Sequence, residues 1–263
     1  MRMRFVLLTL ALLSALPPAH AQEDAVVITA VRDPVAKSYR RMVSGIERFE
    51  RRRQLAPRAT LRFKILPRNR QTDMRNVALA IEAESFSLPL ELAADNSFAL
   101  PRHAAAMAED ASVMPNRRAG TMTWRAEVRS PGVPPGKRRL GDLRLECEVG
   151  MQAGLISNRR PSLFRWMDPL VREGPEYCHR LAPRYLFFAE RPLWSVTLVA
   201  GGRREVLPVD RLYGGATRDP DWKADLPYCD CEVLIDRAYF LPLGDESWPD
   251  DTLIEFEYME DAP

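Results

Sequence analysis

Residues 77–101 constrain the fold most, because short apolar runs alternate there with turn-forming residues. Their sequence, VALAIEAESFSLPLELAADNSFALP, predicts three short strands joined by two turns. A similar order returns from Val196, and both stretches place a Leu-Pro-apolar triplet at the same spacing, at Leu88 and Leu207. This repetition indicates an internal duplication. The alternative is that strands in a Pro-rich chain end independently at Pro, which cannot donate a hydrogen bond to a ladder.

The hydrophobic period changes from that of a helix to that of a strand near Thr60. Before it, apolar residues at steps of three and four predict a helix that begins at Asp33-Pro34 and ends before Pro57. Its apolar face comprises Val35, Tyr39, Met42, Ile46 and Phe49. After Thr60 the alternation over 61–65 predicts a strand, as does that over 143–149, and Gly201-Gly202 predicts a hairpin turn.

These patterns predict an α+β fold, mostly β, with two antiparallel β-sandwich-like modules preceded by one amphipathic helix. The expected segments are a signal peptide at 1–21, an N-terminal strand and basic helix at 22–59, a first β module at 60–150, an irregular connector at 151–192 and a second β module at 193–263.

The first residues have the features of an export signal. Arg2 and Arg4 precede an apolar run over 5–16, and Ala19-His20-Ala21 predicts cleavage before Gln22. The apolar run is too short to span a bilayer, and no later run is long enough, so we expect a soluble exported protein without a transmembrane segment. The strong preference for Arg over Lys favours a bacterial periplasm, with secretion as the alternative.

Charge is balanced overall but unevenly distributed. Without the signal, basic and acidic residues are equal in number, which gives no overall attraction to nucleic acid. Residues 32–75 hold fourteen Lys or Arg against four acids, whereas 219–263 hold fourteen acids against two basic residues. We therefore expect the basic helix face to meet the acidic C-terminal region, within one chain or by self-association; the alternative is two solvated faces. That helix face comprises Arg40, Arg41, Arg48 and Arg51.

Four cysteines, Cys147, Cys178, Cys229 and Cys231, predict two disulfides in an exported chain. A bridge between Cys229 and Cys231 would close a strained ring. We therefore expect Cys147–Cys231 with Cys178–Cys229, since Cys147 and Cys231 both lie in predicted strands, or else the crossed pairs. The alternatives are free thiols or a zinc site that would add His179 to Cys178, Cys229 and Cys231. We expect no metal and no cofactor.

The sequence gives little support to catalysis. No zinc-protease, serine-hydrolase or phosphate-binding motif is present.

Four acids surround Trp248 in one stretch: Asp245, Glu246, Asp250 and Asp251. They could serve a glycosidase or lie solvated in a loop. Trp222 and Trp248 occur in polar loops, which favours exposure for binding. Asp219, Asp221 and Asp225 do not have the spacing of a calcium-binding loop.

Two function classes remain. The first is a non-catalytic envelope protein that binds a protein partner or a glycan, and the second is a hydrolase of an envelope polymer such as a glycan. The enzyme class is uncertain, and the sequence favours the non-catalytic one. A pocket that brings together His179 or the 245–251 acids would favour the hydrolase, whereas acids directed into solvent would favour the binding protein.

Overall fold

The computed structural model describes residues 36–68, 71–118, 120–156, 174–181, 183–212 and 235–261. The helices there are α1 (Tyr39–Arg51), α2 (Ala104–Ala108) and α3 (Leu140–Gln152), with short 3-10 helices η1 (Arg53–Leu55), η3 (Gly174–His179), η4 (Val209–Arg211) and η6 (Ile235–Arg237). The strands are β1 (Lys37–Ser38), β2 (Thr60–Pro67), β3 (Leu79–Glu82), β4 (Ser87–Leu90), β5 (Ser97–Phe98), β6 (Ser112–Pro115), β7 (Met122–Arg129), β8 (Lys137–Arg139), β9 (Phe187–Phe188), β10 (Leu193–Ala200), β11 (Arg203–Val206), β12 (Ala238–Tyr239) and β13 (Leu253–Tyr258).

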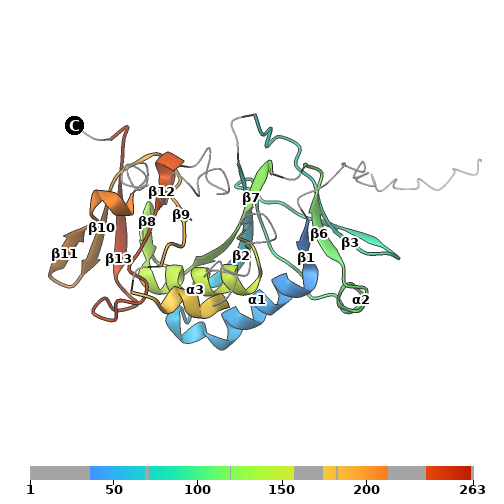
Figure 1. Cartoon of the computed structure of the whole chain (residues 1–263), viewed down its shortest axis with the longest axis horizontal. Coiled ribbons are helices and arrows are strands. Elements are labelled where there is room, and N and C mark those ends of the chain that lie inside the picture. The colour runs from blue at the N-terminus through green and yellow to red at the C-terminus, as the bar shows by residue number, and fades with distance from the viewer. Residues whose placement is uncertain are drawn as a thin grey trace, which may run out of the picture.

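The strands pair antiparallel throughout the described part of the chain. They form the sheets β1-β6-β3-β4, β5-β2-β7 and β11-β10-β13-β8, with β9 and β12 as a separate pair. The sheets stand on either side of α3, while α1 and α3 lie side by side along one long edge of the molecule (Figure 1). This arrangement confirms the predicted class, α+β and mostly β.

Helix α1 confirms the predicted amphipathic helix but begins later, at Tyr39. The Ser38 side chain accepts a hydrogen bond from the Arg41 N–H at 3.3 Å, which caps the first turn. Arg48 and Arg51 lie in the last turn, where positive charge is favourable to the helix dipole. Of the predicted apolar stripe, Tyr39, Met42 and Phe49 are buried, and Ile46 is partly buried. The predicted start at Asp33-Pro34 lies outside the described residues.

Helix α3 contributes to two hydrophobic cores. Leu145 and Val149, with Ala153 directly after the helix, pack into a core built from α1 and the sheets that precede α3. Leu140, Leu143 and Cys147 pack into a second core with the sheet that contains β10 and β13. The helix starts without a side-chain cap, because the Leu140 and Gly141 N–H groups donate to backbone carbonyls of the loop before β13. This one helix therefore joins the two cores.

The strand predicted over 143–149 was wrong, because these residues lie inside α3. Apolar residues alternate there with acids, as in a half-buried strand. The acids are also buried, however, so the helix has no solvent-facing side that would reveal a period of 3.6 residues. The buried acids are Asp142, Glu146 and Glu148.

The hairpin at Gly201-Gly202 is confirmed, with β10 and β11 paired across it. Gly201 has a positive φ of 56°, which glycine adopts without the steric cost that a Cβ would impose. The internal duplication is not confirmed. The repeat equates β7 with β13, but β7 pairs with β2 in one sheet, whereas β13 pairs directly with the hairpin strand β10.

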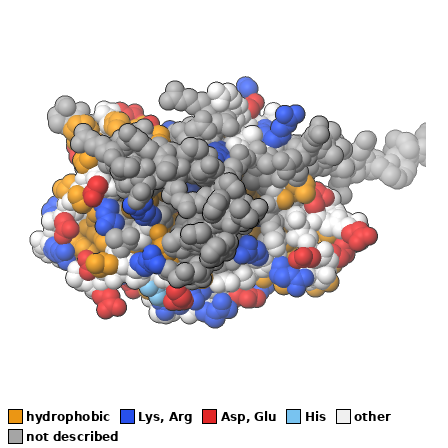
Figure 2. All heavy atoms as spheres, in the orientation of Figure 1, with side chains coloured by type: hydrophobic (Ala, Val, Ile, Leu, Met, Phe, Trp, Pro, Cys, Tyr) orange, Lys and Arg blue, Asp and Glu red, His pale blue; other side chains and the backbone are white. Residues whose placement is uncertain are grey.

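None of the helices in the described residues combines the length and apolar character needed to cross a membrane. Figure 2 shows Lys or Arg and Asp or Glu side chains interspersed over the described surface of one face, so this face has no extended region of a single charge. The packed scaffold therefore presents a mixed polar exterior there.

Candidate functional site

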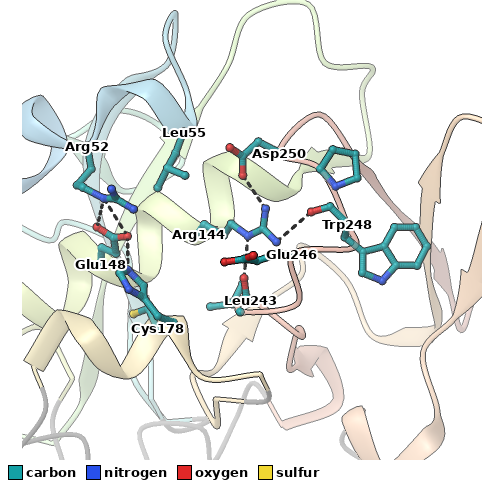
Figure 3. A pocket seen from close by; sticks show the side chains of 12 residues that line it. Arg52, Leu55, Arg144, Glu148, Cys178, Leu243, Glu246, Trp248 and Asp250 are labelled. Atoms are coloured by element: carbon teal, nitrogen blue, oxygen red, sulfur yellow. Dashed lines mark hydrogen bonds and ion pairs between the residues drawn. The ribbon is translucent and has the colours of Figure 1, made fainter.

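A pocket of about 510 Å³ opens beside α3, and we call it the α3 cleft (Figure 3). It lies where α3 meets η1, η3 and the 243–250 loop. Its lining residues are Arg52, Leu55, Arg144, Glu148, Cys178, His179, Leu243, Gly244, Glu246, Trp248, Pro249 and Asp250. This volume lies within the range of about 300–1,000 Å³ that is usual for small-molecule sites.

Glu148 is a buried carboxylate of α3 at the wall of the α3 cleft. It accepts hydrogen bonds from Arg48 Nε at 2.7 Å and Arg52 Nε at 3.1 Å, and it contacts His179 Nε2 at 2.9 Å. Burial acts to raise the pKa of Glu148, but the hydrogen bonds from His179 and Arg52 and the charge of Arg48 outweigh it. The pKa is therefore lowered, and Glu148 is ionised at neutral pH.

His179 is held on both sides of its ring. Its Nε2 contacts Glu148 at 2.9 Å, and its Nδ1 contacts Glu176 at 3.2 Å. The disulfide between Cys147 and Cys178 ties η3 to α3, so the residue next to His179 is covalently fixed. The position of this histidine is therefore set by two carboxylates and one covalent bridge.

Arg144 organises the opposite wall. From α3 it donates to the Leu243 carbonyl at 2.7 Å and to Asp250 Oδ1 at 2.6 Å. It also donates to the carbonyls of Asp245 at 2.8 Å and Trp248 at 3.0 Å. All three guanidinium nitrogens are thereby used to hold the 243–250 loop, and Asp250 is neutralised by the same side chain.

Gly244 lets this loop approach η3 closely. Its N–H donates to the Arg180 carbonyl at 3.0 Å, and a Cβ at this position would collide with the carbonyl oxygens of His179 and Arg180.

We expect Gly244→Ala to displace the loop and to lower the free energy of unfolding by about 1–3 kcal/mol, as overpacking does. Urea unfolding measures this. Gly202→Ala is the control, because nothing lies within 4 Å of a Cβ there; equal stability of the two variants would contradict the close contact.

The predicted acids have separate roles. Asp245 accepts hydrogen bonds from the hydroxyl and N–H groups of Ser247, and these lower the pKa of Asp245. Asp250 pairs with Arg144, and Asp251 is exposed outside the α3 cleft. Glu246 is exposed at the cleft, where no other described residue forms an ion pair or hydrogen bond with it. The structure thus brings Glu246 and Asp250 together with His179 in one pocket.

The predicted exposure of Trp248 was wrong. Its side chain is buried, at 1% relative exposure, and the Arg203 guanidinium lies 3.6 Å from its ring centroid. The loop around it is polar, but the backbone of that loop is anchored by Arg144, and the indole turns into the second core. Trp222 lies outside the described residues.

The predicted cysteine pairing was also wrong. Cys147 pairs with Cys178, rather than with Cys231 or Cys229. The error followed from placing Cys147 in a strand, since α3 instead brings it against η3. Cys178 is therefore no zinc thiolate, and no group of three or more potential metal ligands occurs within the described ranges. Cys229, Cys231 and the acids Asp219, Asp221 and Asp225 lie outside those ranges.

The basic face of α1 has partners other than the C-terminal acids. Arg48 contacts Glu148 and Glu176, Arg40 contacts Asp110 at 3.2 Å, and Arg51 contacts Glu47 at 3.9 Å. Arg41 lies beside Gly154. Within the described part of the chain, this face therefore forms its ion pairs with α3, η3, the turn between α2 and β6 and its own helix, and none with residues 235–261; residues 219–234 of the acidic region lie outside the described ranges. Self-association stays a prediction.

Sequence reasoning missed Arg52, Arg144 and Glu148. Arg144 and Glu148 are four residues apart, which places them on one face of a helix, and a helical interpretation of 140–152 would have brought them together. Arg52 and Glu148 are distant in sequence, and only the packing of α1 against α3 brings them into contact.

Comparison of the chain with protein-family models, with curated proteins and with solved structures finds no match. The α3 cleft must therefore be interpreted from its own chemistry.

Proposed function

We propose that this chain is an exported, non-catalytic binding protein of the cell envelope, and that it binds through the α3 cleft. One observation carries the proposal: most charged groups of the cleft are already engaged in internal ion pairs. Glu148 is shared by Arg48, Arg52 and His179, and Asp250 is held by Arg144. These ion pairs hold the lining side chains in place before a ligand arrives. Little side-chain conformational entropy is therefore lost when a ligand binds, and this favours a binding site.

The alternative is a hydrolase, and the convergence of His179, Glu246 and Asp250 in one pocket favours it. A general base, however, needs a free lone pair within hydrogen-bonding reach of the proton it removes. Both ring nitrogens of His179 contact carboxylates, and the sulfur of Cys178 is in a disulfide, which removes a nucleophile. The ion pairs therefore favour binding over hydrolysis.

Export is part of the proposal and rests on residues 1–21 together with the disulfide. A disulfide that joins a buried helix to η3 is stable in an oxidising compartment such as the periplasm. The intact mass of protein recovered from the periplasm or medium should lack the first 21 residues.

The proposed function is tested by incubating the purified chain with isolated cell-wall glycan that retains its peptides. We expect the protein to sediment with the polymer and to release no soluble fragments. Fragment release that is abolished in Asp250→Asn or His179→Gln, in variants that keep the wild-type circular dichroism, would instead establish the hydrolase.

A further inference from the structure

We infer that the α3 cleft binds a zwitterionic ligand, a free amino acid or a short peptide with free termini, and this inference rests on the proposed binding function. The observation behind it is that one cation of the cleft keeps free donors and one carboxylate of the cleft has no hydrogen-bond or ion-pair partner among the described residues. These are Arg52 and Glu246, and they belong to different walls of the pocket (Figure 3).

Arg52 offers a carboxylate site. Its Nε donates to Glu148 at 3.1 Å, which fixes the guanidinium, and its side chain is 32% exposed. Both of its hydrogen bonds to described residues come from Nε, and its terminal nitrogens Nη1 and Nη2 donate to none of them. A guanidinium held in this way presents a planar pair of donors that matches the geometry of a carboxylate.

Glu246 offers an ammonium site. It is exposed and projects from the 243–250 loop, whose backbone is fixed by Arg144. Its carboxylate is not engaged by any described side chain, in contrast to Glu148 and Asp250. An ammonium group of a ligand would give Glu246 the charge-assisted hydrogen bond that the protein does not supply.

The remaining lining selects against other ligands. Leu55, Leu243 and Pro249 provide apolar surface for the body of a ligand. A polyanion would meet the negative charges of Glu246 and Asp250, and a polycation would meet Arg52 and Arg144. A ligand with one charge of each sign and an apolar body satisfies all of these groups.

Titration calorimetry at low salt tests the inference with one apolar tripeptide in three forms: free, N-acetylated and C-amidated. We expect each blocked form to bind about tenfold more weakly than the free form, the loss of one charge-assisted hydrogen bond. Glu246→Gln should weaken the free form by about the same factor and leave the N-acetylated form unchanged. Arg52→Lys should weaken the free form and leave the C-amidated form unchanged, because the planar donor pair is lost.

Glu91→Gln and Arg58→Lys are the matched controls, since both side chains are exposed outside the α3 cleft, and they should not change the affinity. Equal binding of free and blocked peptides, or no heat from any form at millimolar concentration, would overturn the inference. If the chain still sediments with cell-wall polymer in that case, the proposed function stands without this ligand class. Cleavage of the peptide would instead refute the proposed function.

Discussion

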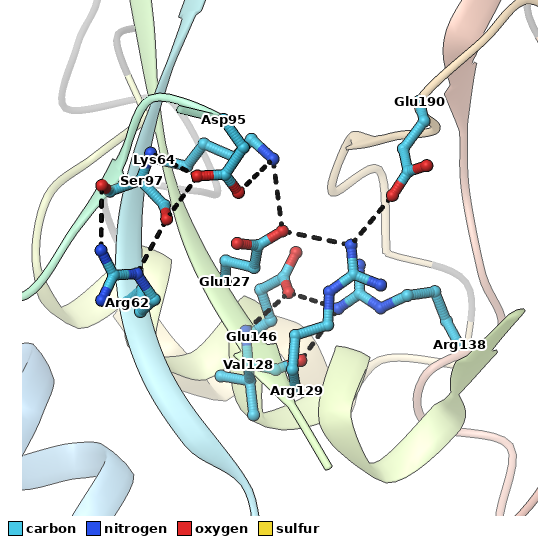
Figure 4. Close-up of polar contacts among 10 residues, drawn as sticks. All are labelled: Arg62, Lys64, Asp95, Ser97, Glu127, Val128, Arg129, Arg138, Glu146 and Glu190. Carbon is cyan, nitrogen blue, oxygen red and sulfur yellow. Dashed lines mark hydrogen bonds and ion pairs between the residues drawn. The ribbon is translucent and has the colours of Figure 1, made fainter. Parts of the chain in front are cut away.

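Replacing Glu146 by Ala is expected to lower the free energy of unfolding by about 3–5 kcal/mol. Glu146 accepts hydrogen bonds from Arg138 Nη2 at 2.7 Å and from the Val128 N–H at 3.1 Å (Figure 4). The side chains of Arg138 and Glu146 are only 8% and 9% exposed. Burial raises the pKa of Glu146. Burial acts to lower the pKa of Arg138, but the negative charge of Glu146 outweighs it, so the pKa of Arg138 is raised. Removal of Glu146 leaves an uncompensated charge in the interior.

Urea unfolding monitored by circular dichroism measures this loss. Glu257→Ala is the control, because the Glu257 side chain is exposed and, among the described residues, hydrogen-bonds only with the Ser195 hydroxyl, so its removal should cost less than about 1 kcal/mol. The double variant Glu146→Leu with Arg138→Met should recover most of the stability, since replacing both members of a buried pair removes the uncompensated charge. A cost for Glu146→Ala no larger than that of the control would show that the pair is not buried in solution.

Removing the bridge by the double change Cys147→Ala and Cys178→Ala should lower the free energy of unfolding by about 3–4 kcal/mol in the chain-entropy model. The bridge spans a sequence separation of 31 residues and joins α3 to η3. The midpoint of thermal unfolding should fall by roughly 10 °C for a chain of this size. His179 should also lose its fixed position at the α3 cleft, because η3 is then held to α3 only by non-covalent contacts.

Differential scanning calorimetry measures the shift, with Cys229→Ala plus Cys231→Ala as the matched double variant. Peptide mapping without reduction gives a direct check of the connectivity, since it should recover Cys147 and Cys178 in one cross-linked fragment. A fragment that joins Cys147 to Cys229 or Cys231 would contradict the observed pairing.

Local patterns predicted much of the fold. The stripe of Met42 and Phe49 indicated α1, the alternation after Thr60 indicated β2, and Gly201-Gly202 indicated the β10–β11 hairpin. These elements are exposed on one side, so polar and apolar residues report their period directly. Such elements are the ones that a single sequence describes well.

The central helix could not be predicted in the same way, because α3 is buried on nearly every side. Its acids resemble the solvent side of a strand, yet each is satisfied by groups from elsewhere: Asp142 by Ser130, Glu146 by Arg138 and Glu148 by Arg52. These contacts depend on packing between distant segments. The error about α3 then spread to the cysteine pairing and concealed the α3 cleft.

Of the candidate site, the sequence indicated His179, Glu246 and Asp250 but not what holds them. Asp250 resembled a free loop acid until the structure placed it against Arg144. Trp248 resembled an exposed binding residue until its loop folded against the second core. The chemistry of a side chain is set by its partners, and these partners are remote in sequence.

The most direct test of the central claim, that the charged groups of the α3 cleft support the fold rather than catalysis, is the stability of Glu148→Gln as a function of pH. At pH 7 the variant should be less stable than the wild type by about 2 kcal/mol. This is less than the cost of breaking a fully buried ion pair, because the partners of Glu148 are partly exposed. The pKa of Glu148 is lowered in the folded state. Its contribution is therefore fully present above the unfolded value of about 4.3 and is lost as the pH falls through the folded value.

The account predicts that the difference in the free energy of unfolding between wild type and Glu148→Gln is constant from pH 7 to about pH 5 and shrinks below about pH 4. Equal stability of the two proteins at pH 7 would contradict it, because Glu148 would then be a carboxylate that the fold does not need and that remains available for chemistry.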